Sequence, residues 1–211
     1  MYYAPRVLRV GSLLIVLSGP CSYDGPGEAI AAPKGTDLID VTTVIPDAVL
    51  EIRYATKHNF TGAVLYPVAT CKLRRAVADK LVKAAAALRK LDRRLLIWDC
   101  YRPLSIQKVL WKKVSDPRYV ADPSVGSKHN RGAAVDLAVV DKAGKAVVLP
   151  TAFDEFTVAA HRDRALVGPS GKEAKRLEDA MLAAGFTAMA TEWWHYDASD
   201  AGNYALSDEP L

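Results

Sequence analysis

The stretch from Ser127 to Asp136 reads "SKHNRGAAVD" and continues as "LAVVD" through residue 141. Its arginine-glycine pair indicates a turn, and the apolar run that follows indicates a buried strand. An aspartate, Asp136, therefore stands inside the strand, and a histidine, His129, stands just before the turn. Because a buried carboxylate is costly unless it is paired, Asp136 predicts a partner from another part of the chain.

A second histidine, His195, is a candidate for that partner because of the residues around it. His195 lies in "TEWWHYD", and Glu192 stands three residues before it. If His129, Asp136 and His195 bind one zinc ion, the divalent cation offsets the cost of burying the carboxylate. Three protein ligands with a fourth position open to water is the arrangement of catalytic zinc sites. Spacing alone leaves a second interpretation open, in which both histidines make only structural hydrogen bonds.

Glu192 adds a candidate general base. On a flat strand, side chains an odd number of residues apart face opposite ways. Glu192 and His195 therefore reach one metal only if the chain bends between them. Glu192 would then take a proton from the water at the metal rather than serve as a fourth ligand.

Arg102 lies in "DCYRP", residues 99–103, at the exit of a predicted buried strand. Loops at such positions often face a cleft. Arg102 has a structural interpretation, a salt bridge with Asp99. It also has a functional one, a cation aimed at the oxyanion that forms when water attacks a carbonyl, or at a substrate carboxylate.

Hydrophobic periodicity predicts helices and strands without regular alternation, which indicates an α+β fold in a single domain. A β-rich entry is expected over residues 36–56. The predicted helices cover residues 72–91, residues 103–114, and a segment from a capping box at Ser170–Glu173 to Gly185. The predicted strands cover residues 94–99, 134–140 and 146–149, the last two as a hairpin, and a final strand within residues 186–197.

Composition is that of an ordinary globular protein. The chain has 211 residues, half of them hydrophobic, and a formal net charge of +4. Its basic clusters, residues 72–75 and 89–94, are interpreted as solvated helix faces, because acidic residues are interleaved and stacking aromatics do not accompany them. We therefore expect no nucleic-acid partner.

The N-terminus has the pattern of a secretory signal peptide. Two arginines precede the apolar residues 10–17, and a small-x-small sequence ends at Ala31. The apolar run is shorter than the roughly 20 residues of a transmembrane helix. We predict a signal peptide over residues 1–31 and an exported, periplasmic domain over 32–211, without stable membrane insertion after cleavage. Lipidation at Cys21 and a cytoplasmic chain with a disordered N-terminal tail are the alternatives.

Two cysteines remain after that cleavage, Cys71 and Cys100. A pair of cysteines in an exported protein indicates one disulfide. The competing interpretation makes Cys100 a catalytic nucleophile, although no histidine lies near it in the sequence.

These motifs together resemble a known family. "SKHNRGAAVD", "EWWH" and "DCYRP" match, in order, the SxHxxGxAxD, ExWH and DxYRP patterns of the zinc D-Ala-D-Ala metallopeptidases, and specifically the VanX-type dipeptidases, which they resemble. "RYATKHNFTG" at residues 53–62 also resembles the dipeptidase branch. The resemblance runs from about residue 38 to 196. It implies a small, mainly antiparallel sheet flanked by helices, the Hedgehog/DD-peptidase-like zinc fold.

The resemblance also implies roles for individual residues. It makes His129, Asp136 and His195 the ligands of one Zn²⁺ per chain, Glu192 the catalytic base, and Arg102 the group that stabilises the transition state. It further implies that the free amino group of the substrate is held by three side chains, those of Ser127, Tyr54 and Asp154.

The implied function is hydrolysis of the small dipeptide D-Ala-D-Ala to two D-Ala, in peptidoglycan metabolism or glycopeptide resistance. One alternative is a D,D-carboxypeptidase or endopeptidase acting on peptidoglycan stem peptides. Another is a non-catalytic relative that binds zinc and peptide, which has no need of a base such as Glu192. The residues after His195 extend past the usual end of the family and suggest no role, and the sequence makes no prediction of the oligomeric state.

Overall fold

The computed structural model describes residues 35–211, and these residues lie within one compact unit. The predicted signal peptide lies outside the described residues. Within the described part of the chain, no helix is long and apolar enough to cross a membrane.

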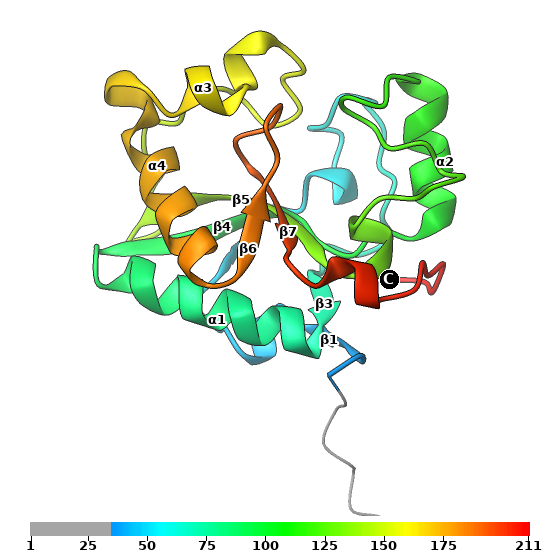
Figure 1. The fold of residues 1–211 in the computed structure, drawn as a ribbon, viewed down its shortest axis with the longest axis horizontal. Helices are drawn as coiled ribbons and strands as arrows, with labels where there is room; N and C mark the ends of the chain where they lie inside the picture. Colours follow the sequence, from blue (N-terminus) through cyan, green and yellow to red (C-terminus); the bar gives the residue numbers. More distant parts are fainter. Residues whose placement is uncertain (1–34) are drawn as a thin grey trace, which may run out of the picture. The chain divides into compact units, whose positions relative to one another are not determined.

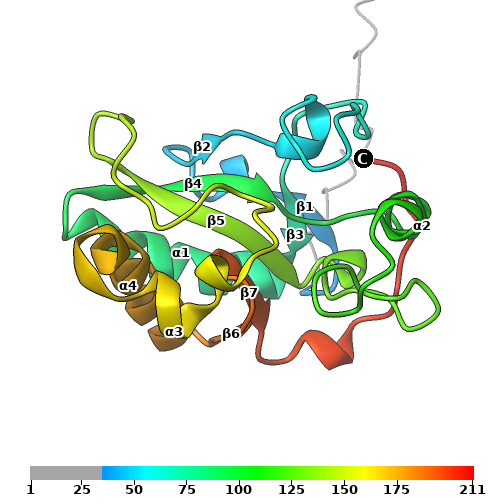
Figure 2. The same ribbon diagram turned by 90° about the horizontal axis from the view of Figure 1, so that it is seen from above.

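A five-stranded sheet forms the centre of the fold, in the order β2-β4-β5-β7-β6 (Figures 1 and 2). Its strands are β2 (Val49–Leu50), β4 (Arg93–Asp99), β5 (Ala134–Asp141), β6 (Phe186–Ala188) and β7 (His195–Ala198). Strand β2 runs parallel to β4, and the other neighbours are antiparallel. Two further strands, β1 (Leu38–Asp40) and β3 (Lys72–Arg74), form a separate antiparallel pair. The expected α+β fold with a mainly antiparallel sheet is confirmed.

The central strands are buried along almost their whole length. In β5, every residue from Ala134 to Val140 is buried, as is β4 from Leu95 onward. Strands of this kind read as continuous apolar runs because both of their faces are covered. Helices α1 (Arg75–Arg89) and α4 (Gly168–Ala183) lie side by side against the sheet (Figures 1 and 2). Trp98 of β4 packs edge-on or tilted against Phe153 and Trp193 from the loops.

The helices differ from their predicted bounds at their N-terminal ends. Helix α1 begins at Arg75 rather than at residue 72, because the preceding residues pair with β1 as strand β3. Helix α4 begins at Gly168, so the capping box predicted at Ser170 is wrong: that serine lies inside the first turn. The predicted end at Gly185 is confirmed by its left-handed backbone, φ 94°. Helix α2 (Leu104–Lys113) follows Pro103 as expected.

Two strand predictions are also wrong. Residues 146–149 form no strand and contribute only one bridge, Ala146 to Val140. Residues 186–197 form two strands, β6 and β7, joined by a turn rather than one continuous strand. That turn carries Glu192.

The predicted disulfide between Cys71 and Cys100 is present, with a Cα–Cα distance of 5.2 Å. It ties the residue before β3 to the residue after β4. Because both sulfurs are bonded to each other, the alternative in which Cys100 is a nucleophile is wrong.

Reducing this disulfide is expected to lower the free energy of unfolding by about 2–4 kcal/mol, because it frees a loop with a sequence separation of 29 residues in the unfolded chain. Urea unfolding of metal-free protein, with and without a phosphine reductant, measures the change. The Cys71→Ser/Cys100→Ser double variant is the control and should not respond to the reductant. An unchanged midpoint for the wild-type protein would contradict the prediction.

Candidate active site

The site forms where three neighbouring strands present polar side chains side by side. Asp136 of β5 pairs directly with His195 of β7 on one side and with Asp99 of β4 on the other. A bulge in β4 between Ile97 and Asp99 brings that aspartate into register. Since directly paired residues share a face of the sheet, strand register alone places these three side chains together.

His129 reaches the same point from the short helix η3 (His129–Arg131), just before β5. The turn ends at Gly132, whose left-handed backbone, φ 66°, favours glycine. A Cβ on Gly132 would also come within 2.5 Å of the Leu38 side chain. The glycine noticed in the sequence is therefore what returns the chain into β5 with His129 beside Asp136.

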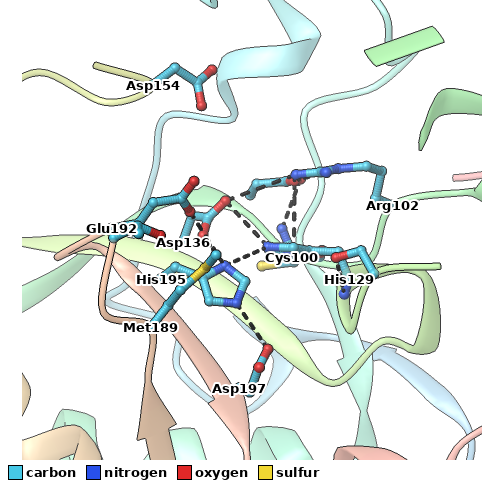
Figure 3. A network of polar contacts seen from close by, with 12 residues as sticks. Cys100, Arg102, His129, Asp136, Asp154, Met189, Glu192, His195 and Asp197 are labelled. Carbon is cyan, nitrogen blue, oxygen red and sulfur yellow. Dashed lines mark hydrogen bonds and ion pairs between the residues drawn. The ribbon is translucent and has the colours of Figure 1, made fainter. Parts of the chain in front are cut away.

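The three predicted metal ligands converge in the structure, and all three are buried (Figure 3). His129 Nε2 lies 3.3 Å from Asp136 Oδ2, and His195 Nδ1 lies 3.0 Å from Asp136 Oδ1. The two histidine nitrogens are 3.2 Å apart. These atoms lie within 4.8 Å of one another and could hold a single metal ion.

The outer nitrogens of both histidines have acceptors that fix their protonation. His129 Nδ1 lies 2.6 Å from the carbonyl oxygen of Cys100, which can only accept, so Nδ1 carries the proton. His195 Nε2 donates in the same way to Asp197 Oδ1 at 2.9 Å. Each ring therefore turns its other nitrogen toward Asp136. This is the arrangement in which histidines ligate a metal, so the residues present fit the implied ion.

Asp197 was missed in the sequence, although it stands in the quoted "TEWWHYD" motif. Residues two apart on a strand face the same way, and Asp197 follows His195 by two positions in β7. That spacing is the signal that could have identified it. The Cys100 carbonyl gives no such signal in the sequence, because every residue type has a backbone carbonyl.

Glu192 lies in the turn between β6 and β7, so the bend that the sequence required is present. Its Oε2 is 4.0 Å from His195 Nδ1, and its side chain is buried. Burial raises the pKa of Glu192 to about 8, with the positive charge of His195 opposing the rise and the charge of Asp136 adding to it. A buried carboxyl with a pKa in this range can exchange protons near neutral pH.

The structural interpretation of Arg102 is confirmed, and its position is compatible with the functional one. It forms the salt bridge with Asp99, through Nη2 at 2.6 Å and Nε at 3.1 Å. It also faces the pocket, with Nη2 4.0 Å from Asp136 Oδ2 and its guanidinium over the ring of Tyr54. The Tyr66 hydroxyl donates to the same Asp99 carboxylate at 2.7 Å, and this hydrogen bond holds the carboxylate in place.

The remaining predicted residues line the same pocket. The Tyr54 hydroxyl donates to Asp154 Oδ2 at 3.2 Å, and Asp154 lies apart from the metal ligands (Figure 3). Ser127 Oγ accepts the backbone N–H of His129 at 3.2 Å. The structure thus brings all eight predicted site residues to one pocket: Tyr54, Arg102, Ser127, His129, Asp136, Asp154, Glu192 and His195.

Asp154 lies in the same pocket as the acidic side chains of Asp136 and Glu192. Burial raises the pKa of Asp154 well above its usual range, and the nearby charges of Asp136 and Glu192 raise it further. The charge of Arg102 opposes this rise only in part. A divalent cation or an ammonium group beside these carboxyl groups would favour their charged forms.

The C-terminal residues, for which the sequence suggested no role, pack behind the site. Ser207 donates its N–H to the Asn130 carbonyl and accepts the N–H of Leu104. The Asn130 side chain in turn donates to the carbonyl of Arg102 at 2.8 Å. The tail therefore joins the segment that carries Arg102 to the turn that carries His129.

Comparison with known proteins agrees with this geometry. Residues 34–209 match the Peptidase M15 family, described as D-Ala-D-Ala dipeptidase. The chain belongs to this family. It is 35% identical to a D-alanyl-D-alanine dipeptidase of Escherichia coli (strain K12) over 81% of this chain and 89% of that protein.

More distant relatives have the same name. A D-alanyl-D-alanine dipeptidase of Enterococcus faecium is 30% identical over 76% of this chain and 86% of its own length. One from Streptomyces coelicolor is 32% identical over 69% of this chain and 83% of its own length. The family resemblance noted in the sequence is confirmed, and the chain is a metallopeptidase of the dipeptidase class.

Proposed function

We propose that this chain is a zinc-dependent dipeptidase that hydrolyses D-Ala-D-Ala to two D-Ala, with the eight predicted residues in the roles given below. The observation that carries the proposal is the donor set formed by His129, Asp136 and His195, with Glu192 beside it. The relatives' names supply the substrate.

Two histidine nitrogens and one carboxylate are a ligand set typical of catalytic zinc. Zinc bound there would polarise the scissile carbonyl and lower the pKa of a water molecule to about 7. The ligands' outer partners, the Cys100 carbonyl and Asp197, hold the imidazole rings in the orientation that this binding needs.

Glu192 carries the proton in the proposed reaction. Its carboxylate takes a proton from the attacking water and returns it to the nitrogen of the leaving D-Ala, so the peptide C–N bond breaks with no net change in protonation. Arg102 supplies N–H donors for the oxygen of the former carbonyl as it gains negative charge. Because Asp99 fixes the guanidinium in advance, little reorganisation is needed at that moment.

Recognition of the substrate's free ammonium is assigned to Asp154, Tyr54 and Ser127. The Asp154 carboxyl is costly to ionise where it lies, so a cationic ligand beside it is favoured. The Tyr54 and Ser127 oxygens add acceptors for the remaining N–H groups. A substrate whose amino group is blocked would leave these groups unpaired, and a site of this kind rejects such analogues strongly.

Zinc-loaded protein is therefore expected to release D-Ala from free D-Ala-D-Ala and at least about 100-fold more slowly from N-acetyl-D-Ala-D-Ala. Asp154→Asn should narrow this difference. Equal cleavage of both compounds would indicate the D,D-carboxypeptidase or endopeptidase alternative. Cleavage of neither, at one bound zinc per chain, would indicate the non-catalytic alternative.

We further propose that the domain is exported and acts in the periplasm, in peptidoglycan metabolism or glycopeptide resistance. The residue pattern of the first 31 positions and the Cys71–Cys100 disulfide both support export, because disulfides persist mainly in oxidising compartments. N-terminal sequencing of the protein recovered from a periplasmic extract tests this: cleavage near Ala31 supports it, and an intact Met1 contradicts it.

A further inference from the structure

We infer that Gln107 is a positioning residue that fixes the orientation of Arg102 and links it to the wall of the substrate pocket. Gln107 lies on α2 and its side chain is completely buried, with 0% exposure. Its Oε1 accepts a hydrogen bond from Arg102 Nη1 at 2.8 Å. Its Nε2 donates to the carbonyl oxygen of Ala121 at 2.7 Å.

The chemistry of these partners permits only one orientation of the amide. A guanidinium can only donate and a backbone carbonyl can only accept, so the amide oxygen must face Arg102 and the amide nitrogen must face Ala121. Among the described residues, Gln107 is the only side chain that is hydrogen-bonded to both the Arg102 guanidinium and the Ala121 carbonyl. A buried amide with both ends hydrogen-bonded is stable, whereas leaving either end unpaired is costly.

Gln107 decides which donors of Arg102 remain for the substrate. Arginine has five N–H donors, and Asp99 takes those of Nε and one of Nη2. Gln107 takes one donor of Nη1. One N–H on each terminal nitrogen remains, and Nη2 is the nitrogen that lies 4.0 Å from Asp136 Oδ2. Without Gln107, the only remaining hydrogen-bond acceptor for the guanidinium among the described side chains would be the single oxygen Asp99 Oδ2, about which the whole planar group could pivot.

The second hydrogen bond reaches the substrate pocket directly. Ala121 and its neighbour Val120 line the pocket, as do Arg102 and the metal ligands. Gln107 therefore joins the cation that faces the reacting carbonyl to a loop that shapes the binding space. This inference rests on the proposed role of Arg102, and it assigns the orientation of Arg102 and the position of the loop to one side chain.

Two variants separate these two contacts. Gln107→Met keeps the length of the side chain and removes both hydrogen bonds, so kcat for D-Ala-D-Ala should fall by about 10–100-fold and KM should rise. Gln107→Glu keeps an oxygen acceptor for Arg102 but loses the amide donor to Ala121. Its kcat should return to within about threefold of wild type while KM stays raised about tenfold. Both variants should bind one zinc, and Lys108→Met, at an exposed position of α2, is the matched control.

A purely structural role would lower the unfolding temperature of both variants without this split between kcat and KM. Wild-type kcat in Gln107→Met, or equal loss of kcat in both variants, would overturn the inference. The ¹⁵Nε resonance of Arg102 in metal-free protein gives a readout that needs no turnover: it should shift in Gln107→Met and stay near its wild-type position in Gln107→Glu. If the wild-type protein releases no D-Ala, the proposed function fails, and this resonance still decides whether Gln107 orients Arg102.

Discussion

Replacing Glu192 with glutamine is expected to lower kcat for D-Ala-D-Ala by about 10²–10⁴-fold while one zinc per chain stays bound. Glutamine has nearly the same shape as glutamate but cannot take a proton from water at neutral pH. Glu192 approaches His195 only to 4.0 Å and is not one of the three converging ligands, so the metal site should persist. Initial rates of D-Ala release and metal analysis of the same sample measure both quantities.

Glu209→Gln is the matched control for this substitution, because it removes an exposed carboxylate from the C-terminal tail. It should keep wild-type kcat and zinc content. If Glu192→Gln retains full activity with its zinc bound, another group moves the proton and the mechanism proposed here is wrong.

Asp136→Asn is expected to abolish both stoichiometric zinc binding and D-Ala release. Asp136 supplies the only carboxylate among the three converging ligands, and the two histidines alone leave an incomplete site. The neighbouring histidines also hold the pKa of Asp136 well below its usual range despite its burial, so the wild-type residue is the charged form that a metal needs. Titration against a chromophoric zinc chelator measures the affinity.

Asp197→Ala provides a graded comparison in the same titration. Its carboxylate contacts the outer nitrogen of His195 rather than the metal position, so zinc affinity should fall by only about 10–100-fold. Activity should return at saturating zinc. An Asp136→Asn variant that binds one zinc as tightly as wild type would show that the ligand set has been assigned incorrectly.

The ligand set could be predicted from the sequence because its residue types are out of place locally. Asp136 interrupts an apolar run, and buried carboxylates need partners, which made the search for His129 and His195 specific. The structure adds the reason that they meet: Asp136 and His195 are directly paired across β5 and β7. The chain turn before His195 was also predictable, since Glu192 could not otherwise reach the site.

The supporting partners were harder to predict because they depend on tertiary packing. Gln107 lies only five residues after Arg102, yet nothing about a glutamine in a helix signals that it is buried. The Cys100 carbonyl that orients His129 has no side-chain signature at all.

Errors in secondary structure have the same origin. Residues 72–74 have a helical pattern, yet they form β3 because residues 38–40, far away in sequence, provide a pairing edge. Residues 146–149 are a short apolar run, yet they contribute only one bridge, from Ala146 to Val140. At residues 72–74, the availability of a strand partner overruled local propensity.

The most direct test of the central claim is a zinc titration of chelator-stripped wild-type protein, with D-Ala release from D-Ala-D-Ala measured at each addition. If His129, Asp136 and His195 hold one catalytic ion, activity should be absent at the start, rise in proportion to added zinc, and stop rising at one equivalent per chain. Full activity in the stripped protein, or none at one bound equivalent, would contradict the account.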